Sequence, residues 1–206
     1  MHPSLTVLFV GALYLLGFTG LSMVRRQRPS LRFLLEGGII TALAVITTLV
    51  FTPLSPILFL LVIYLVTMRV RLLVDLGNFF SARGRYERAL ALFDLALRLG
   101  PDLASRQIVL INRGVTQLRM GQPDAAYFTL KAILLAEEVK AAARYLAAGY
   151  YNMGVACLRT GRKQEACRHF RQTIEILPGS IYAHAAVEAL KRENPQNGGA
   201  AARKGT

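Results

Sequence analysis

The chain has 206 residues, of which 53% are hydrophobic and 18% charged, and its net charge is +13. A soluble domain is roughly 45–50% apolar, so this composition excludes a chain that is disordered throughout. The length suits one domain plus a small second part, which excludes a multidomain enzyme. Two cysteines are too few for a disulfide scaffold or a structural zinc site. The positive charge favours acidic partners or anionic lipid.

Charge divides the chain into two parts near residue 69. Residues 1–68 hold one acidic residue, Glu36, and four basic residues that lie in one short loop, namely Arg25, Arg26, Arg28 and Arg32. All other charged residues lie in 69–206. We therefore expect a transmembrane anchor over residues 1–68, followed by a water-exposed part.

Three apolar runs in the first part predict membrane-spanning helices. Residues 5–24 are uncharged, and a helix of that length spans about 30 Å, one hydrocarbon core. No Lys or Arg precedes this run, which argues against a cleaved signal peptide. Residues 33–51 form the second run, and Pro53 and Pro56 separate it from a third at 54–68.

The third run has only 15 residues and spans about 22 Å. It crosses the membrane if the helix continues and Arg69 and Arg71 snorkel to the surface. The alternative is a re-entrant or interfacial hairpin. Basic residues beside spans prefer the cytoplasm, and three spans put the 25–32 loop, Arg69 and Arg71 inside together. We therefore expect an integral protein of a bacterial inner membrane, with its N-terminus outside and its C-terminal domain cytoplasmic.

Glu36 is the one acidic residue within the apolar part. It follows Arg32 by four residues, one helical turn, and this spacing predicts an ion pair at the membrane interface. An ion or proton site is the alternative.

Residues 69–193 repeat a pattern that starts at Gly77, Gly114 and Gly154. Each of these glycines is followed by a glycine seven residues on, an alanine twelve on and a large apolar residue sixteen on. In chain order these are Gly84, Ala89 and Phe93, then Gly121, Ala126 and Leu130, then Gly161, Ala166 and Phe170. A proline follows after 24 residues in the first and third copies, Pro101 and Pro178, while the second copy has Glu138.

This pattern resembles the tetratricopeptide repeat (TPR), a helix–turn–helix unit of about 34 residues, and looks like a membrane-anchored bacterial member of that family. The resemblance implies an all-α fold, in which the transmembrane helices precede an α-solenoid of about three repeats and a C-terminal capping helix. The expected repeats are 70–103, 107–138 and 147–180, the cap is 181–193, and 194–206 is expected to be a disordered tail. The leading glycines are 37 and 40 residues apart. We therefore expect the helices before Gly114 and Gly154 to be lengthened by about one and two turns, with 139–146 continuing the latter.

The resemblance also implies a concave groove, lined by the first helix of each repeat, that binds an extended or helical peptide. The residues it places there are Asn78, Asn112, Arg119, Tyr151, Asn152 and Arg159. Amides can hold a peptide backbone and arginines a carboxylate. Asn78 and Asn112 match a two-carboxylate clamp found in some members, but Val74, Ala148 and Asn152 occupy its basic positions. Alternatively, the asparagines only brace the helix pairs.

No pattern points to catalysis, a cofactor or a metal. The sequence contains no P-loop, dinucleotide-binding glycine motif or His-Glu-x-x-His, and we expect no enzyme. Cys157 and Cys167 lie ten residues apart around a repeat turn, which leaves a redox or metal role open, but a place in the core is the favoured interpretation. The basic residues are dispersed over several helices, so we expect no nucleic-acid binding. Apposition to anionic lipid explains the positive charge, and an acidic protein partner explains it equally well.

Three functions remain open. The main prediction is a membrane-anchored scaffold or adaptor that mediates protein–protein interaction or complex assembly through its groove. The alternative is a structural subunit of a larger membrane complex, bound through small residues of its spans; these are Gly11, Gly17, Gly20, Gly37 and Gly38. A regulator that recruits an enzyme would differ from the first only in its partner.

Overall fold

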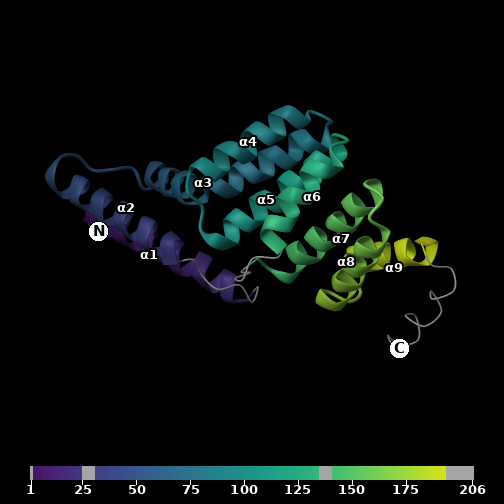
Figure 1. The fold of residues 1–206 in the computed structure, drawn as a ribbon. Helices are drawn as coiled ribbons and strands as arrows, with labels where there is room; N and C mark the ends of the chain where they lie inside the picture. Colours follow the sequence, from purple (N-terminus) through teal and green to yellow (C-terminus); the bar gives the residue numbers. More distant parts are fainter. Residues whose placement is uncertain (1, 25–30, 135–140, 194–206) are drawn as a thin grey trace. The chain divides into compact units, whose positions relative to one another are not determined.

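The computed structural model describes residues 2–24, 31–134 and 141–193, and these residues form nine α-helices and no strand (Figure 1). The helices are α1 (Pro3–Val24), α2 (Leu31–Val50), α3 (Pro56–Ala82), α4 (Tyr86–Arg98), α5 (Leu103–Arg119), α6 (Pro123–Leu134), α7 (Ala143–Arg159), α8 (Lys163–Ile176) and α9 (Ile181–Glu193). The predicted all-α class is confirmed. The chain forms two compact units, an N-terminal unit (Met1–Leu72) and a C-terminal unit (Leu73–Thr206).

Close approach of α1 and α2 organises the N-terminal unit. A Cβ on Gly11 would lie 2.5 Å from Thr41 Cγ2, and a Cβ on Gly37 would overlap the Leu15 side chain. Small residues therefore let the two backbones pack directly. Val7, Tyr14 and Ala44 are buried in the cluster that results.

Helix α3 runs without a break from Pro56 to Ala82, so the short third apolar run does continue as a helix, which makes it long enough to span. Its first turns belong to the N-terminal unit, where Phe59 and Ile63 are buried beside α1 and α2. The Tyr14 hydroxyl lies 2.6 Å from Thr67 Oγ1. The boundary between the two units falls within this helix, after Leu72.

Helices α1, α2 and α3 are each long and apolar enough to cross a membrane. Most of the exposed large hydrophobic side chains among the described residues belong to these three helices. Such a surface is costly in water and is the surface that a lipid bilayer accommodates.

The predicted ion pair of Glu36 is present. Arg32 Nε donates to Glu36 Oε1 at 2.6 Å, one turn away on α2. Arg69 of α3, 33 residues away in sequence, adds two further hydrogen bonds to the same carboxylate, at 2.6 and 2.8 Å. Two guanidinium groups therefore share one carboxylate, which ties α3 to α2.

In the C-terminal unit the glycine pattern places the first and second helices of each repeat in contact. A Cβ on Gly77 would lie 2.5 Å from the Phe93 ring, and one on Gly154 would lie 2.6 Å from the Phe170 ring. The second repeat uses Leu130 in the same way, at 2.7 Å from a Cβ on Gly114. Residues that lie sixteen positions apart in the repeat pattern are therefore in direct contact between the two paired helices.

The turn that follows each first helix has the same backbone geometry. Gly121 and Gly161 adopt φ values of +84° and +78°, the left-handed region that glycine enters without steric cost. The next residue's N–H closes the turn: Gln122 donates to Gln117 O at 2.9 Å, and Arg162 donates to Cys157 O at 2.8 Å. This is the Schellman geometry, and it ends the helix cleanly.

First helices stack on first helices, and α9 closes the end of the stack. Helix α5 packs on α7, and α7 packs on α9, which also packs on α8. Figure 1 shows α5 to α9 following one another in chain order. Ala183 and Ala186 of α9 are buried, so this face of the helix lies against the preceding repeat.

One predicted helix is wrong in part. Of the residues 139–146, Ala141 and Ala142 lie outside any helix, Ala142 has an extended backbone, and α7 begins at Ala143. Helices α5 and α7 have 17 residues each, and Gly114 and Gly154 occupy the same position in them. The longer spacing before Gly154 therefore lies before Ala143, where the Gln107 side chain accepts a hydrogen bond from Ala141 N at 2.9 Å.

Several predicted features lie outside the described residues. They are Arg25, Arg26 and Arg28, the 135–140 segment with Glu138, and the tail at 194–206.

Candidate functional site

The first helices of the C-terminal unit, together with the capping helix, line an open cavity of about 410 Å³. Helices α3, α5, α7 and α9 all contribute to its wall. The lining residues are Asn78, Ser81, Ala82, Ile111, Asn112, Val115, Thr116, Arg119, Arg144, Tyr145, Ala148 and Tyr182. Its volume is that of a small-ligand or peptide side-chain pocket.

Three of the six predicted groove residues, Asn78, Asn112 and Arg119, line this cavity together. Within the described part of the chain, the Asn78 side chain makes no hydrogen bond, so its amide is available to a ligand. Asn112 Nδ2 donates to Ile108 O on its own helix at 2.8 Å, which leaves the second N–H and the carbonyl oxygen of its amide for a ligand.

A short polar network positions the Arg119 side chain. The hydroxyl of Thr116 donates to Ser81 Oγ at 2.9 Å, linking α5 to α3, and Arg119 Nη1 lies 3.4 Å from the same oxygen. The Arg119 guanidinium has further N–H donors to offer to an acceptor in the cavity.

The lining of the cavity is positively charged. Arg119 and Arg144 are both exposed, and the twelve lining residues include no Asp or Glu. The Arg144 guanidinium carbon lies 4.8 Å from the centroid of the Tyr145 ring, and Arg144 Nη2 lies 3.3 Å from the Tyr145 hydroxyl. This arrangement suits a ligand that carries a carboxylate.

The other three predicted groove residues, all on α7, do not line this cavity. The Tyr151 ring packs against the rings of Phe170 and Tyr182, with centroids 5.7 and 5.9 Å away. Asn152 Nδ2 donates to Ala148 O at 2.7 Å, and Arg159 Nη1 donates to Leu118 O at 2.7 Å. Each therefore has an intramolecular contact, and a role in binding a partner stays a prediction.

The clamp suggested by the resemblance lacks its cations. Val74 and Ala148 stand at two of its basic positions, and both are buried, with 7% and 8% of their surface exposed. The cavity instead takes its positive charge from Arg119 and Arg144.

Arg144, Tyr145 and Tyr182 line the cavity and were not predicted to do so. Arg144 and Tyr145 lie in the first turn of α7, one turn before Ala148, which also lines the cavity. Tyr182 lies on α9, which we expected only to cap the stack. The four-residue spacing between Arg144 and Ala148, which puts both on one helix face, was the available signal for Arg144.

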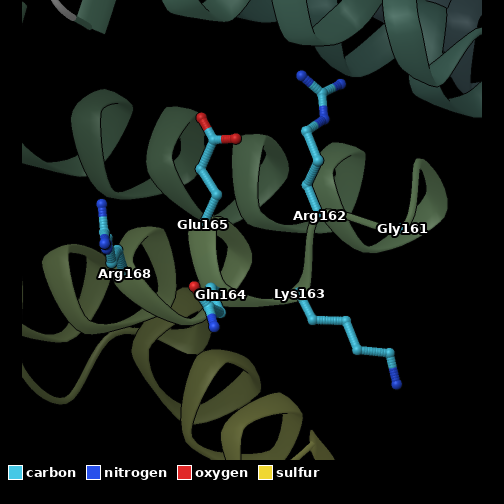
Figure 2. Close-up of a pocket in the computed structure, with 6 residues that line it drawn as sticks. All are labelled: Gly161, Arg162, Lys163, Gln164, Glu165 and Arg168. Atoms are coloured by element: carbon cyan, nitrogen blue, oxygen red, sulfur yellow. The ribbon is translucent and has the colours of Figure 1, made fainter.

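A second, open hollow of about 530 Å³ lies at the start of α8 and is lined by Gly161, Arg162, Lys163, Gln164, Glu165 and Arg168 (Figure 2). Figure 2 shows Arg162 and Glu165 extending to one side of the helix and Lys163 to the other. Arg162 lies 3.6 Å from the centroid of the Tyr127 ring and 3.6 Å from Asp124 Oδ1. These contacts of Arg162 hold the start of α8 against α6.

Cys157 is fully buried in the core, which confirms the favoured interpretation of this residue. Both cysteines are free thiols, and Cys167 is half-buried. Burial raises the pKa of the Cys157 thiol to about 11, so it is not an activated nucleophile at neutral pH.

Comparison with known families agrees with this geometry. Two family models, both described as tetratricopeptide repeat, match the chain, one over residues 72–107 and the other over residues 147–180. Among curated proteins and among solved structures, nothing matches significantly.

Proposed function

Because the chain is a tetratricopeptide repeat protein, we propose that it is a membrane-anchored scaffold that captures an acidic peptide segment of a partner protein in the cavity of its first helices. Repeats of this family act in general in protein–protein interaction and are typically not enzymes. The anchoring, the adaptor role and the chemistry of the partner are our proposals.

The N-terminal unit supports the anchor. Three helices, α1, α2 and the first part of α3, have the length and hydropathy of membrane spans, and their surface is apolar. The arginines between residues 25 and 32 and those after residue 68 support a cytoplasmic C-terminal unit under the positive-inside rule. There its positive charge also favours an anionic leaflet.

The cavity supports the choice of partner. Its two exposed arginines with no lining carboxylate are the observation that carries the proposal. An acidic peptide gains charge-assisted hydrogen bonds from Arg119 and Arg144 and a backbone contact from the Asn78 amide.

Charge reversal tests this proposal. A double variant with Arg119→Glu and Arg144→Glu is purified as the full chain in detergent. Its affinity for a library of acidic peptides is compared with that of the wild type. Truncating a charged hydrogen-bonded partner costs about 2–5 kcal/mol, so we expect at least a tenfold loss of affinity. Arg171→Glu, an exposed position on α8 outside the cavity, is the matched control and should bind as wild type. Equal binding by the doubly reversed variant would contradict the proposal.

Arg159 is a poor position for this test. Its guanidinium donates to Leu118 O at the end of α5, so a carboxylate there would repel the carbonyl and disturb the stack. A loss of binding would then report folding rather than recognition.

The alternative, a subunit bound through its spans, also has an observation in its favour. Of the five small residues proposed for such contacts, Gly11 and Gly37 already pack against α2 and α1, respectively. Gly17, Gly20 and Gly38 meet nothing within 4 Å and could receive a helix of another protein. Gly38→Leu should abolish assembly under this alternative and leave the groove function unchanged.

A further inference from the structure

Three potential metal ligands converge between the helices of the third repeat. Cys157 lies on α7, and Glu165 and His169 lie one turn apart on α8. One ligand atom from each, the cysteine sulfur, a carboxylate oxygen and an imidazole nitrogen, all lie within 4.8 Å of one another. The contact exists because Gly161 turns the chain back so that α8 packs along α7.

The His169 ring is held with one nitrogen aimed into this cluster. Nδ1 lies 2.9 Å from Gln172 Oε1, an acceptor, and in the neutral ring whose Nδ1–H donates to this oxygen, Nε2 carries a lone pair. The His169 side chain is 9% exposed. Nε2 is buried and, among the residues that the structure describes, has no hydrogen-bond partner. A buried acceptor without a donor is costly, and a metal ion would satisfy it.

Glu165 is likewise oriented by a second residue. The Tyr127 hydroxyl of α6 donates to Glu165 Oε1 at 2.7 Å, and the same oxygen lies 3.7 Å from His169 Nε2. Gln172 and Tyr127 thus orient the imidazole and the carboxylate, as outer partners do in metal sites.

We propose that Cys157, Glu165 and His169 bind a divalent metal ion of borderline softness, for which Zn²⁺ is the best fit. Sulfur, imidazole nitrogen and carboxylate oxygen are the three ligand types of protein zinc sites, at about 2.0–2.3 Å from the ion. Ligand atoms around such a tetrahedron are about 3.3–3.8 Å apart, so small side-chain rotations close the site.

Binding changes the protonation of the site. The Cys157 S–H bond breaks, the sulfur bonds to the metal, and the proton passes to solvent. The thiolate and the Glu165 carboxylate then neutralise the two positive charges of the ion. Water takes the fourth position. The ion would link α7 to α8. Because a site of this composition uses only one of the two cysteines, the cysteine count in the sequence did not reveal the site.

Metal titration of the full chain tests the proposal. The protein is purified in detergent without a histidine tag, treated with a chelator and titrated with Co²⁺, whose thiolate bonds give a charge-transfer band, and then with Zn²⁺. We expect one Co²⁺ per chain with that band, and its displacement by Zn²⁺. Absence of the band, or of stoichiometric binding, overturns the proposal.

Variants identify the ligands. Cys157→Ala and His169→Gln should abolish the band, and Glu165→Gln, which keeps an oxygen for Tyr127, should weaken binding at least tenfold. Gln172→Ala, which removes the outer partner of His169, should weaken it about 10–100-fold. Cys167→Ala is the matched control and should bind as wild type, with helicity by circular dichroism checked for each variant. Retention of the band in Cys157→Ala, or its loss in Cys167→Ala, contradicts the assignment.

Discussion

At the scale of single residues, the repeat depends on glycines that leave no room for a methyl group. A Cβ on Gly154 would lie 2.6 Å from the buried Phe170 ring. Overpacking of this kind costs about 1–3 kcal/mol, while replacing a helical glycine recovers about 0.5–1 kcal/mol. We therefore expect Gly154→Ala to lower the free energy of unfolding of the C-terminal unit by about 1–2 kcal/mol, measured by chemical denaturation with circular dichroism. Gly38→Ala, at a helical glycine with nothing within 4 Å, is the control. If the two variants had the same free energy of unfolding, the contact between Gly154 and the Phe170 ring would not be tight.

Tyr150 gives a residue-scale prediction for alkaline pH. Its hydroxyl donates to Leu134 O at 3.1 Å, and burial raises its pKa above the ordinary value of 10.0. A raised pKa favours the protonated form in the folded state, so this stabilisation is complete below about pH 10 and is lost as the pH rises through the folded-state pKa. Tyr150→Phe should cost about 1 kcal/mol at neutral pH and make the decline in stability above pH 10 shallower.

The neighbouring tyrosine supplies the control for that experiment. Among the described residues, the Tyr151 hydroxyl has no hydrogen-bond partner, so Tyr151→Phe should leave stability at neutral pH nearly unchanged. Unfolding midpoints at pH 7 and pH 11 measure both effects. If the two variants decline in parallel with wild type, the Tyr150 hydroxyl is not buried as described.

Local spacing predicted the contacts that lie close in sequence. The Arg32–Glu36 pair follows from a distance of four residues on one helix. The sixteen-residue spacing within each repeat marks the two residues, such as Gly154 and Phe170, that pack together in the helix hairpin. The contact of Arg69 with Glu36, 33 residues away, depends on how two helices pack, and no periodicity specifies that. The same limit applied to the convergence of Cys157 with His169.

At the scale of elements, α9 completes the stack by covering α7 and α8. Ala186 is fully buried there. An unpaired buried carboxylate is strongly unfavourable, so Ala186→Asp should destabilise the C-terminal unit by about 3 kcal/mol or more. His184→Asp, at an exposed position of the same helix, should change stability by less than about 0.5 kcal/mol. Urea titrations of the two variants decide this, and a mild effect of Ala186→Asp would show that α9 is loosely attached.

The sequence predicted which helices form, but it did not predict every residue at which a helix begins or ends. Apolar runs and repeat glycines indicated every helix pair from α3 to α9. The start of α7 was missed because residues 139–146 contain no glycine or proline. Ala141 N instead donates to the Gln107 side chain of α5, a long-range contact that the local sequence does not specify. Arg144 lies four residues before Ala148, so the two share one face of α7 and both line the cavity.

At the scale of the whole molecule, the proposed topology can be tested without knowledge of any partner. In sealed inverted membrane vesicles, a protease should digest a tag placed after Thr206 and spare one placed before Met1. Right-side-out vesicles should give the opposite pattern, because three spans put the two ends on opposite sides. A C-terminal tag digested in right-side-out vesicles would refute the proposed orientation.

The central claim is that the cavity of the first helices, rather than the membrane spans, receives the partner. Site-specific photocrosslinking in intact cells measures this directly, with the photoreactive residue at Asn78 in the cavity or at Gly38 on an open helix face. We predict a protein adduct at Asn78 that disappears with Arg119→Glu and Arg144→Glu, and none at Gly38. An adduct at Gly38 with none at Asn78 would contradict the account and favour a subunit held through its spans.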